Sequence, residues 1–323
     1  MGTNSGYRPT STIARERLTR LEHPALLYGT VEEFLSCLVP FVSGGIDNGE
    51  PVFVAVGADH LAALRDEVGE GAAGVTWADT REWHPDPATR LRAFHELVRD
   101  ELAGGATRLR LVGEPVWPAD APELVLEWKR YESVLNAVLG PFPVSLVCTY
   151  DTSRLDPSIT ADARRTHPRV REGAERVSPQ FEAPEQLLGQ WVAELPPPPA
   201  DAAAFQGSVD LHAAREFLNG EALAAGLKPA RARDLCLAAT EVLTNALVHG
   251  GGGAGLRAWP LEGTFFCQID DAGRGLTDPL AGYLPPSPAV DSGRGLWLAR
   301  QLVDLLQIVP APGGTTVRLR MAR

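Results

Sequence analysis

Four consecutive prolines, Pro196–Pro199, limit what this chain can fold into. Proline fixes φ and has no backbone N–H, so the run can continue neither a helix nor a central strand and favours a stiff, extended connection. The 323 residues are enough for two domains, and 44% of them are hydrophobic, which suffices for a core in each. We therefore predict a flexible N-terminus over residues 1–20, a first domain over 21–190, a linker over 191–203 and a second domain over 204–323.

Composition excludes several classes of protein. The net charge of −11 and the pI near 5.2 argue against a protein that binds nucleic acid through bulk charge. The four cysteines are scattered and form no C-x-x-C pair, which indicates reduced thiols rather than a disulfide framework or a zinc knuckle. No run of about 18 apolar residues occurs, and the first twenty residues lack an apolar core. We expect a cytoplasmic protein with no direct nucleic-acid or membrane partner.

The first domain alternates short apolar runs with helical periodicity. "ALLY", "VFVAV", "LRLVG" and "VSLVCTY" have the pattern of buried strands, and segments such as "VEEFLSCLVPFVSGG" and "ELVLEWKRYESVLNAVL" between them have that of helices. This alternation favours right-handed crossovers and a mostly parallel sheet. The residues from Thr152 to about Arg176 are charged and poorly periodic, and a short helix is expected in "PEQLLGQWVAEL". The predicted class is α/β.

The second domain has a different pattern. "VDLHAAREFLNGEALAAGL" and "RARDLCLAATEVLTNALVHG" predict helices, "GLRAWPLEGTFFCQIDD" a hairpin that turns near Glu262, "GLWLARQLVDLL" another helix and "TTVRLRM" a final strand. Helices followed by antiparallel strands predict an α+β two-layer sandwich.

Polar residues in this second domain recur at informative positions. Glu241, Asn245 and His249 follow an i, i+4, i+8 spacing and so share one helical face, where a carboxylate and an amide can coordinate a hard cation. Taken alone, the triplet is also compatible with a solvated polar face. The glycine run after it lacks the Gly-Lys-Ser/Thr of a P-loop and is better explained as a helix end and hinge.

Three further motifs follow in order. "DDAGRG" places an aspartate at a strand end, where it can accept from an exocyclic amine, beside glycines that permit close backbone approach. "SGRGLWLARQL" leads glycines into an amphipathic helix whose N-terminus suits phosphate oxygens, and "GGTTVRLR" supplies hydroxyls at the start of the last strand. Each has a plain alternative: a surface turn, a flexible helix entry and a good β-former. Their fixed order is what favours a nucleotide site.

Residues from about 205 to 322 resemble the GHKL ATPase family, and most closely the anti-sigma-factor serine kinases. The resemblance implies a Bergerat-type ATP-binding domain that uses ATP and Mg²⁺, with Glu241 orienting or deprotonating the attacking hydroxyl and Asn245 as the metal ligand. It implies that Asp271 holds the adenine amino group, and that His249 is structural. The remaining nucleotide-binding residues that it implies are Gly273, Gly275, Gly293, Arg294, Gly295, Leu296, Thr315 and Thr316.

The same resemblance implies transfer of the γ-phosphate to a serine or threonine of an anti-anti-sigma-type partner, with a sigma factor as a second partner. Two alternatives stay open: a binding switch that uses ATP without turnover, and a sensor like a histidine kinase. His212 stands alone ahead of the second domain's motifs, which disfavours the latter. A homodimer is implied by family likeness only.

The first domain resembles the MEDS sensory domain, on the segments "HPALLYGTVEEFLSCLVPFVSGGIDNGEPVFVAV", "LVGEPVW", "WKRYESVLNAV" and "VSLVCTYDTSRL". That resemblance implies a RecA- or KaiC-like fold and a small, hydrocarbon-derived ligand. No Walker A loop lies between Leu27 and Val31, so ATP hydrolysis there is not expected. The pocket predicted at the carboxyl ends of the strands contains His23, Tyr28, Glu114, Trp117, Cys148, Tyr150 and Asp151. Each of these also has a core or helix-end explanation, and a His–Cys–Asp metal site lacks a ligand spacing.

Overall fold

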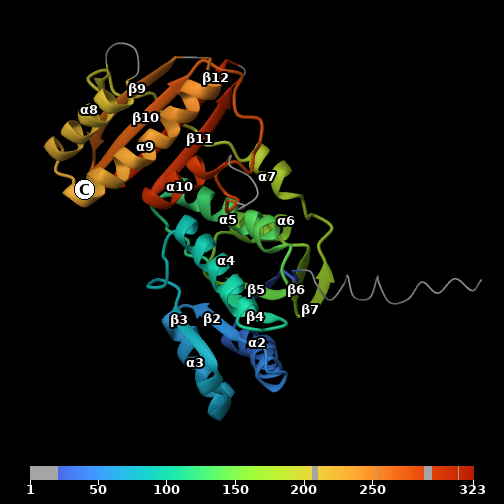
Figure 1. The fold of residues 1–323 in the computed structure, drawn as a ribbon. Helices are drawn as coiled ribbons and strands as arrows, with labels where there is room; N and C mark the ends of the chain where they lie inside the picture. Colours follow the sequence, from blue (N-terminus) through green and yellow to red (C-terminus); the bar gives the residue numbers. More distant parts are fainter. Residues whose placement is uncertain (1–20, 206–209, 252, 287–292, 312) are drawn as a thin grey trace, which may run out of the picture. The chain divides into compact units, whose positions relative to one another are not determined.

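The computed structural model describes residues 21–205, 210–251, 253–286, 293–311 and 313–323. The described chain forms two compact units (Figure 1). We call residues 21–117 and 131–182 the N-terminal unit, and residues 118–130 and 183–323 the C-terminal unit. The predicted flexible N-terminus lies outside the described residues.

The N-terminal unit contains a seven-stranded sheet in the order β3-β2-β4-β5-β1-β6-β7. All neighbouring strands are parallel except β6 and β7, so the predicted parallel-rich α/β fold is confirmed, while its RecA- or KaiC-like character stays a prediction. The strands are β1 Pro24–Tyr28, β2 Val52–Val56, β3 Val75–Asp79, β4 Leu109–Gly113, β5 Val144–Asp151, β6 Arg169–Glu172 and β7 Ala174–Val177.

Helices cover both faces of this sheet. The helices are α2 Val31–Asp47, α3 Ala58–Val68, α4 Pro87–Ala103, the Tyr131–Leu139 part of α5 (Pro122–Leu139) and α6 Pro157–Thr166, with a 3₁₀ turn at Gly69–Gly74. Figure 1 shows α2 and α3 on one side of the strands and α4 on the other. The side chains of Thr30, Asp86 and Asp156 cap the first turns of α2, α4 and α6, which fixes where these helices begin.

The connection from β1 to α2 is only Gly29 and Thr30. The Gly29 N–H donates to Glu33 Oε2 at 2.7 Å, and the Glu33 N–H donates to Thr30 Oγ1 at 3.3 Å. A phosphate-cradling P-loop needs a longer glycine-rich stretch with a lysine. The first strand therefore leads directly into its helix.

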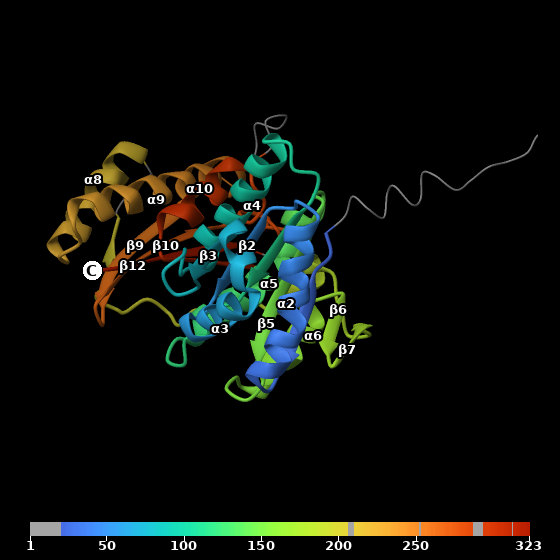
Figure 2. The same cartoon turned by 90° about the horizontal axis from the view of Figure 1, so that it is seen from below.

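The C-terminal unit contains a five-stranded antiparallel sheet in the order β11-β12-β10-β9-β8. Its strands are β8 Ala203–Ala204, β9 Ala254–Leu261, β10 Thr264–Asp271, β11 Leu305–Ala311 and β12 Gly314–Ala322, and its helices, besides Pro122–Arg130 of α5, are α7 Pro184–Gln190, α8 Leu211–Ala224, α9 Pro229–His249 and α10 Arg294–Leu302. Figure 2 shows α8, α9 and α10 on one side of this sheet. Alternate strand residues such as Phe265, Cys267 and Leu319 pack with these helices in one core. The predicted antiparallel second sheet is confirmed.

Two segments differ from the sequence prediction. The helix predicted over "GLWLARQLVDLL" ends at Leu302, and Leu305 already lies in β11. The poorly periodic stretch after Thr152 contains α6, β6 and most of β7. The linker over residues 191–203 stays a prediction; within it, the Pro196 carbonyl accepts from the Arg318 guanidinium of the same unit at 2.6 Å.

None of the helices in the described part of the chain combines the length and the apolar character that a membrane crossing requires.

Candidate nucleotide site and sensory pocket

The polar stripe on α9 lies at the edge of the C-terminal core. Glu241 and Asn245 are half-buried one helical turn apart, and His249 is exposed at the last turn. The start of α10 packs closely against this stripe, since a Cβ at Gly295 would lie 2.8 Å from Glu241 Oε2 and 3.5 Å from Asn245 Nδ2. Glycine at position 295 therefore permits the contact that brings the two helices together.

A cavity of about 320 Å³ opens between α9, α10, β10 and β12. Seven of the residues predicted to bind the nucleotide line it: Asn245, Asp271, Gly275, Gly293, Gly295, Leu296 and Thr315. Its walls also include apolar side chains that the sequence placed only in the core or did not single out, namely Val242, Ala246, Ile269, Leu276, Ile308 and Val317. The cavity thus combines apolar walls with a few polar groups, which is the usual composition of a small-molecule site.

The other predicted residues do not line the cavity. Glu241 lies one turn from Asn245 beside Gly295, while Gly273 and Arg294 lie next to lining residues. Adjacent strand residues point to opposite faces of a sheet, so only one of the two threonines can face the cavity. Thr315 lines it, whereas the Thr316 hydroxyl donates to Asp270 Oδ1 at 2.7 Å. His249, which the resemblance made structural, is a lining residue.

Asp271 is held by backbone donors. Its Oδ1 accepts from the N–H groups of Gly273 at 2.8 Å and Thr315 at 3.2 Å. Oδ2 makes no hydrogen bond to the described part of the chain. One carboxylate oxygen is therefore fixed by the protein, and the other is left to a donor on a ligand.

Two glycines allow the end of α9 to approach the aspartate loop. A Cβ at Gly250 would lie 2.6 Å from Asp271 Cβ, and a Cβ at Gly273 would lie 2.6 Å from Gly250 Cα. The start of the glycine run is thus a close-packing position as well as a helix end.

The base of α10 is fixed by a buried ionic cluster within the C-terminal unit. The Arg300 guanidinium, 3% exposed, pairs with Glu127 and lies 3.8 Å from the centre of the Tyr283 ring. Tyr283 donates to Glu127 Oε1 at 3.0 Å, and the Arg130 guanidinium approaches Glu127 Oε2 at 3.3 Å. Burial raises the pKa of Tyr283 to about 12. No local sequence pattern indicates this cluster, because Glu127 lies 156 residues from Tyr283.

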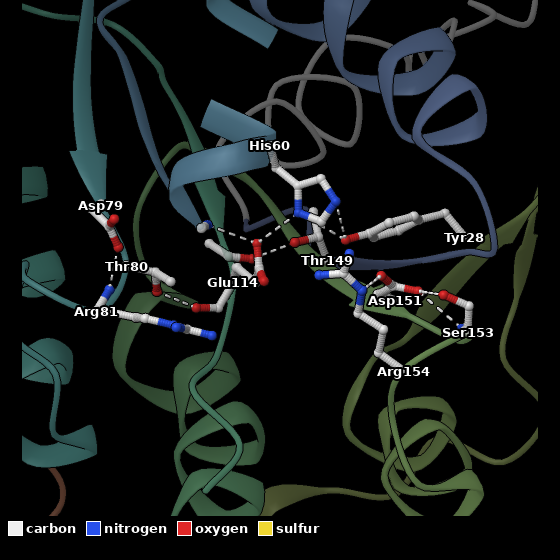
Figure 3. A network of polar contacts seen from close by, with 12 residues as sticks. Tyr28, His60, Asp79, Thr80, Arg81, Glu114, Thr149, Asp151, Ser153 and Arg154 are labelled. Carbon is white, nitrogen blue, oxygen red and sulfur yellow. Dashed lines mark hydrogen bonds and ion pairs between the residues drawn. The ribbon is translucent and has the colours of Figure 1, made fainter. Parts of the chain in front are cut away.

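The N-terminal unit has its own polar cavity, of about 480 Å³, at the carboxyl ends of β2, β3, β4 and β5 (Figure 3). The chain leaves β2 toward β3 and leaves β4 toward β5, on opposite sides, so the cavity lies at a point where the strand order reverses. Three predicted pocket residues line it: Glu114, Trp117 and Asp151. The Trp117 Nε1–H is buried and finds no acceptor among the described residues.

Glu114 organises this cavity. Its Oε2 accepts from the Gly57 N–H at 2.9 Å and lies 3.5 Å from His60 Nδ1, and the Tyr28 hydroxyl lies 3.3 Å from the same ring (Figure 3). The hydrogen bond to Glu114 raises the pKa of His60 and outweighs the opposing effect of burial. His60 carries no motif, and the sequence prediction missed it.

Sequence reasoning missed a buried cation beside this cavity and misplaced part of the predicted pocket. Arg90 donates to the Glu114 carbonyl at 3.0 Å and to Thr80 Oγ1 at 2.7 Å, which holds the cavity wall. The other four predicted residues do not line the cavity, namely His23, Tyr28, Cys148 and Tyr150. His23 precedes β1, at the amino end of the strand, and it lies beside Cys148 in the layer under α5 and α6.

Comparisons with known proteins identify both halves of the chain. The family model described as MEDS, the methanogen/methylotroph, DcmR sensory domain, matches residues 22–168, and that of the histidine kinase-like ATPase domain matches residues 208–321. No curated protein matches the chain.

Two solved structures are also similar to parts of it. The RsbU and RsbW domains of a Mycobacterium tuberculosis protein share 20% identity over 38% of this chain and 33% of that one, with a TM-score of 0.30. This chain spans about a third of that protein's length. The histidine kinase domain of a blue-light activated kinase from Erythrobacter litoralis shares 14% identity over 73% of this chain and 94% of that one, with a TM-score of 0.24. On its two family matches, the chain joins a MEDS sensory domain to a histidine kinase-like ATP-binding domain.

Proposed function

We propose that this protein is a signal-responsive serine/threonine kinase that transfers the γ-phosphate of ATP to an anti-anti-sigma-type partner. The observation that carries the proposal is that Asn245 and Asp271, on α9 and β10, line one cavity, with Glu241 one turn from Asn245 and beside the start of α10. The four ordered motifs that suggested a nucleotide site are thus brought together in space. A cytoplasmic location and an additional sigma-factor partner belong to the same proposal.

The cavity residues divide between the two ends of a nucleotide. Asp271 Oδ2 would accept from the adenine amino group, and the apolar walls would enclose the ring. Asn245 would ligate Mg²⁺, an ion that prefers oxygen donors and neutralises charge on the phosphates. The N–H groups at the start of α10, after Gly293, would contact the phosphate oxygens.

Glu241 is the proposed proton acceptor. The serine or threonine hydroxyl would attack the γ-phosphorus, its proton would pass to the Glu241 carboxylate, and the bond from the γ-phosphorus to the bridging oxygen would break to release ADP. Because such transfer depends mainly on positioning and charge, one helix that carries both the base and the metal ligand is a suitable framework.

Replacement of Glu241 separates the kinase from a binding switch. The full chain, ATP labelled on the γ-phosphate, Mg²⁺ and a candidate anti-anti-sigma protein are combined, and labelled partner is measured. Glu241→Ala should lower the transfer rate by roughly 100-fold or more while ATP affinity stays within about threefold. Glu216→Ala, an exposed acidic residue on α8, is the matched control and should change neither.

Two outcomes would contradict the proposal. Unlabelled partner with wild-type protein, together with ATP-dependent partner binding, would establish the switch instead. Label on a histidine of the chain itself would establish a histidine-kinase reaction.

For the sensory unit we propose a small ligand with polar groups, bound in the cavity of Figure 3. Acidic and basic side chains line this cavity together, including Asp79, Arg81, Asp151 and Arg154. The buried Trp117 Nε1–H, which finds no acceptor among the described residues, adds a donor. A hydrocarbon derivative that carries a hydroxyl, carbonyl or amine would match such a lining better than a bare hydrocarbon.

A thermal-shift screen of a ligand library against the full chain tests the sensory proposal. Trp117→Phe is the variant that removes only this donor. If a ligand binds the wild type and Trp117→Phe equally, it does not use the Trp117 donor, and the proposed sensory site is wrong for that ligand.

A further inference from the structure

Four side chains with metal-ligating atoms meet inside the N-terminal unit. His23, Glu132, Cys148 and His167 each offer one such atom, and these atoms all lie within 4.8 Å of one another. The four residues are between 0% and 2% exposed. They are close in space although the first and last are far apart in sequence, so the fold assembles the cluster.

The sheet and two helices bring the cluster together. Ala25 on β1 is in register with Cys148 on β5, and His23 lies two residues before Ala25, so His23 and Cys148 point to the same face of the sheet. Glu132 reaches them from α5, and His167 from the residue that ends α6. The cluster thus joins the sheet to both helices over it.

The tautomer of His23 is set by Asn136. The Asn136 Nδ2 group donates to two backbone carbonyl oxygens, at 2.8 and 3.0 Å, so its Oδ1 faces His23 Nδ1 at 3.1 Å as an acceptor. His23 Nδ1 therefore carries the proton. The lone pair of Nε2 points toward Cys148 Sγ, 3.3 Å away. Burial lowers the pKa of His23 well below its usual value, which keeps the ring neutral.

The tautomer of His167 is set in the same way. Its Nδ1 lies 2.8 Å from the Ala163 carbonyl oxygen, which can only accept, so Nδ1 is protonated and, in the neutral ring, Nε2 carries a lone pair. That nitrogen lies 3.1 Å from Glu132 Oε2. Neither carboxylate oxygen of Glu132, nor His167 Nε2, makes a hydrogen bond of normal geometry to the described residues.

A positive centre is therefore needed between these groups. An ionised carboxylate and an imidazole lone pair repel each other at 3.1 Å, and burial prevents water from screening them. A proton shared by Glu132 and His167 would satisfy that single contact. A cation coordinated by all four atoms would satisfy the whole cluster.

We propose that His23 Nε2, Glu132, Cys148 Sγ and His167 Nε2 bind one Zn²⁺ in a closed, four-coordinate structural site. Zinc bonds of about 2.0–2.3 Å place tetrahedral ligand atoms about 3.3–3.6 Å apart. The separations here are 3.1 Å from His167 to Glu132, 3.3 Å from His23 to Cys148 and 3.9 Å from His23 to Glu132. Small side-chain movements would bring them to that geometry.

Charge and the outer contacts also favour zinc. A thiolate and a carboxylate cancel the charge of the ion, which suits a buried site. Zinc would replace the Cys148 thiol proton and a proton shared by Glu132 and His167, and both protons would leave to solvent. Asn136 and the Ala163 carbonyl then act as the outer partners that orient the two imidazoles.

Metal analysis of the full chain, expressed with zinc and dialysed, tests the proposal. Wild type should retain about one zinc per chain. Cys148→Ser, which keeps the size of the side chain but removes the thiolate, should weaken zinc binding by more than about 100-fold. Cys37→Ser is the matched control, because Cys37 is also buried in this unit but faces Arg171 instead. It should keep the metal.

Cobalt gives a readout that does not depend on the variants folding. Co²⁺ added to chelator-treated wild type should produce the visible absorption of a tetrahedral ion and a thiolate-to-cobalt charge-transfer band. Zinc binding should release both protons, which calorimetry in buffers of different ionisation enthalpy counts. If folded wild-type protein takes up neither metal, or Cys148→Ser retains zinc as firmly as wild type, the cluster is a proton-linked hydrogen-bond network and the proposal is wrong.

Discussion

Asp270 and Asp271 are neighbours in sequence, yet their carboxylates lie on opposite faces of β10. Asp270 accepts from the Thr316 hydroxyl and from the Gln268 amide on the outer face. Asp271 faces the cavity, where Gly273 and Thr315 hold one of its oxygens. Because side chains alternate between the two faces of a strand, only the Asp271 carboxylate faces the cavity.

This difference predicts unequal effects of two matched substitutions on ATP affinity. Asp271→Asn should weaken ATP binding by roughly 10- to 100-fold, because an amide N–H would then face the adenine amino group and two donors would meet. Asp270→Asn should change the affinity by less than about threefold. Isothermal titration of the full chain with ATP and Mg²⁺ measures both, and equal losses would contradict the assignment of Asp271.

His60 predicts a pH dependence of stability in the sensory unit. Its pKa is raised in the folded protein by the hydrogen bond to Glu114, so the folded state binds a proton more tightly than the unfolded chain. The stabilising contribution is full below the unfolded pKa of about 6.5 and is lost as the pH rises through the higher folded value. NMR titration of the ring should therefore give a midpoint above about 6.5.

Glu114→Gln removes the cause of that shift. The midpoint of His60 should then fall, and the loss of stability between neutral and mildly alkaline pH should become smaller. Glu50→Gln is the control, since Glu50 pairs with Arg110 elsewhere in the same unit. An unchanged His60 midpoint in Glu114→Gln would contradict this explanation.

At the scale of elements, periodicity predicted most helices and strands but could not place every end. The amphipathic pattern of "GLWLARQLVDLL" continues through Leu306, whereas the backbone becomes extended at Val303. The reason is tertiary: the Asp304 N–H donates to the Arg320 carbonyl of β12, and β11 pairs with β12 from Leu305 onward. A strand that exists because of a distant partner gives no local signal.

The turn after β10 also depends on a distant partner. Gly275 has a φ of +78°, and a Cβ there would lie 2.4 Å from the Ala311 carbonyl oxygen. Gly275→Ala should therefore destabilise the C-terminal unit by about 2–3 kcal/mol, because strain and a clash with backbone act together. Chemical denaturation of the full chain measures the change.

Gly253→Ala is the matched control for this prediction. Gly253 belongs to the glycine run after α9, and a Cβ there would meet nothing within 4 Å. Its effect should stay within about 0.5 kcal/mol. If both substitutions cost the same free energy, the close approach at Gly275 does not limit the fold.

At the scale of the whole molecule, the order of the nucleotide motifs was predictable because each is a short local pattern. The sensory residues were predicted less well. From the sequence, His23 and Cys148 group with Glu114 because all three lie near strands. Strand register, and the face of the sheet to which each side chain points, decide whether a residue joins the buried cluster or the cavity at the strand ends. The membership of residues 118–130 in the C-terminal unit was equally invisible, since no motif links this segment to residues 183–323.

That membership leads to a last prediction about the C-terminal unit. Its Arg300 is nearly inaccessible, and its charge is balanced by Glu127, which also accepts from Tyr283. Glu127→Gln leaves the buried guanidinium without a counter-charge and should lower the free energy of unfolding of this unit by about 3 kcal/mol. Glu123→Gln, which breaks a partly exposed pair with Arg320, should cost less than about 1 kcal/mol. Hydrogen exchange across Arg294–Leu302 measures the opening of α10. Because this helix borders the nucleotide cavity, Glu127→Gln should also weaken ATP binding. Equal exchange in the Glu127→Gln and Glu123→Gln variants would contradict the structural role assigned to Glu127.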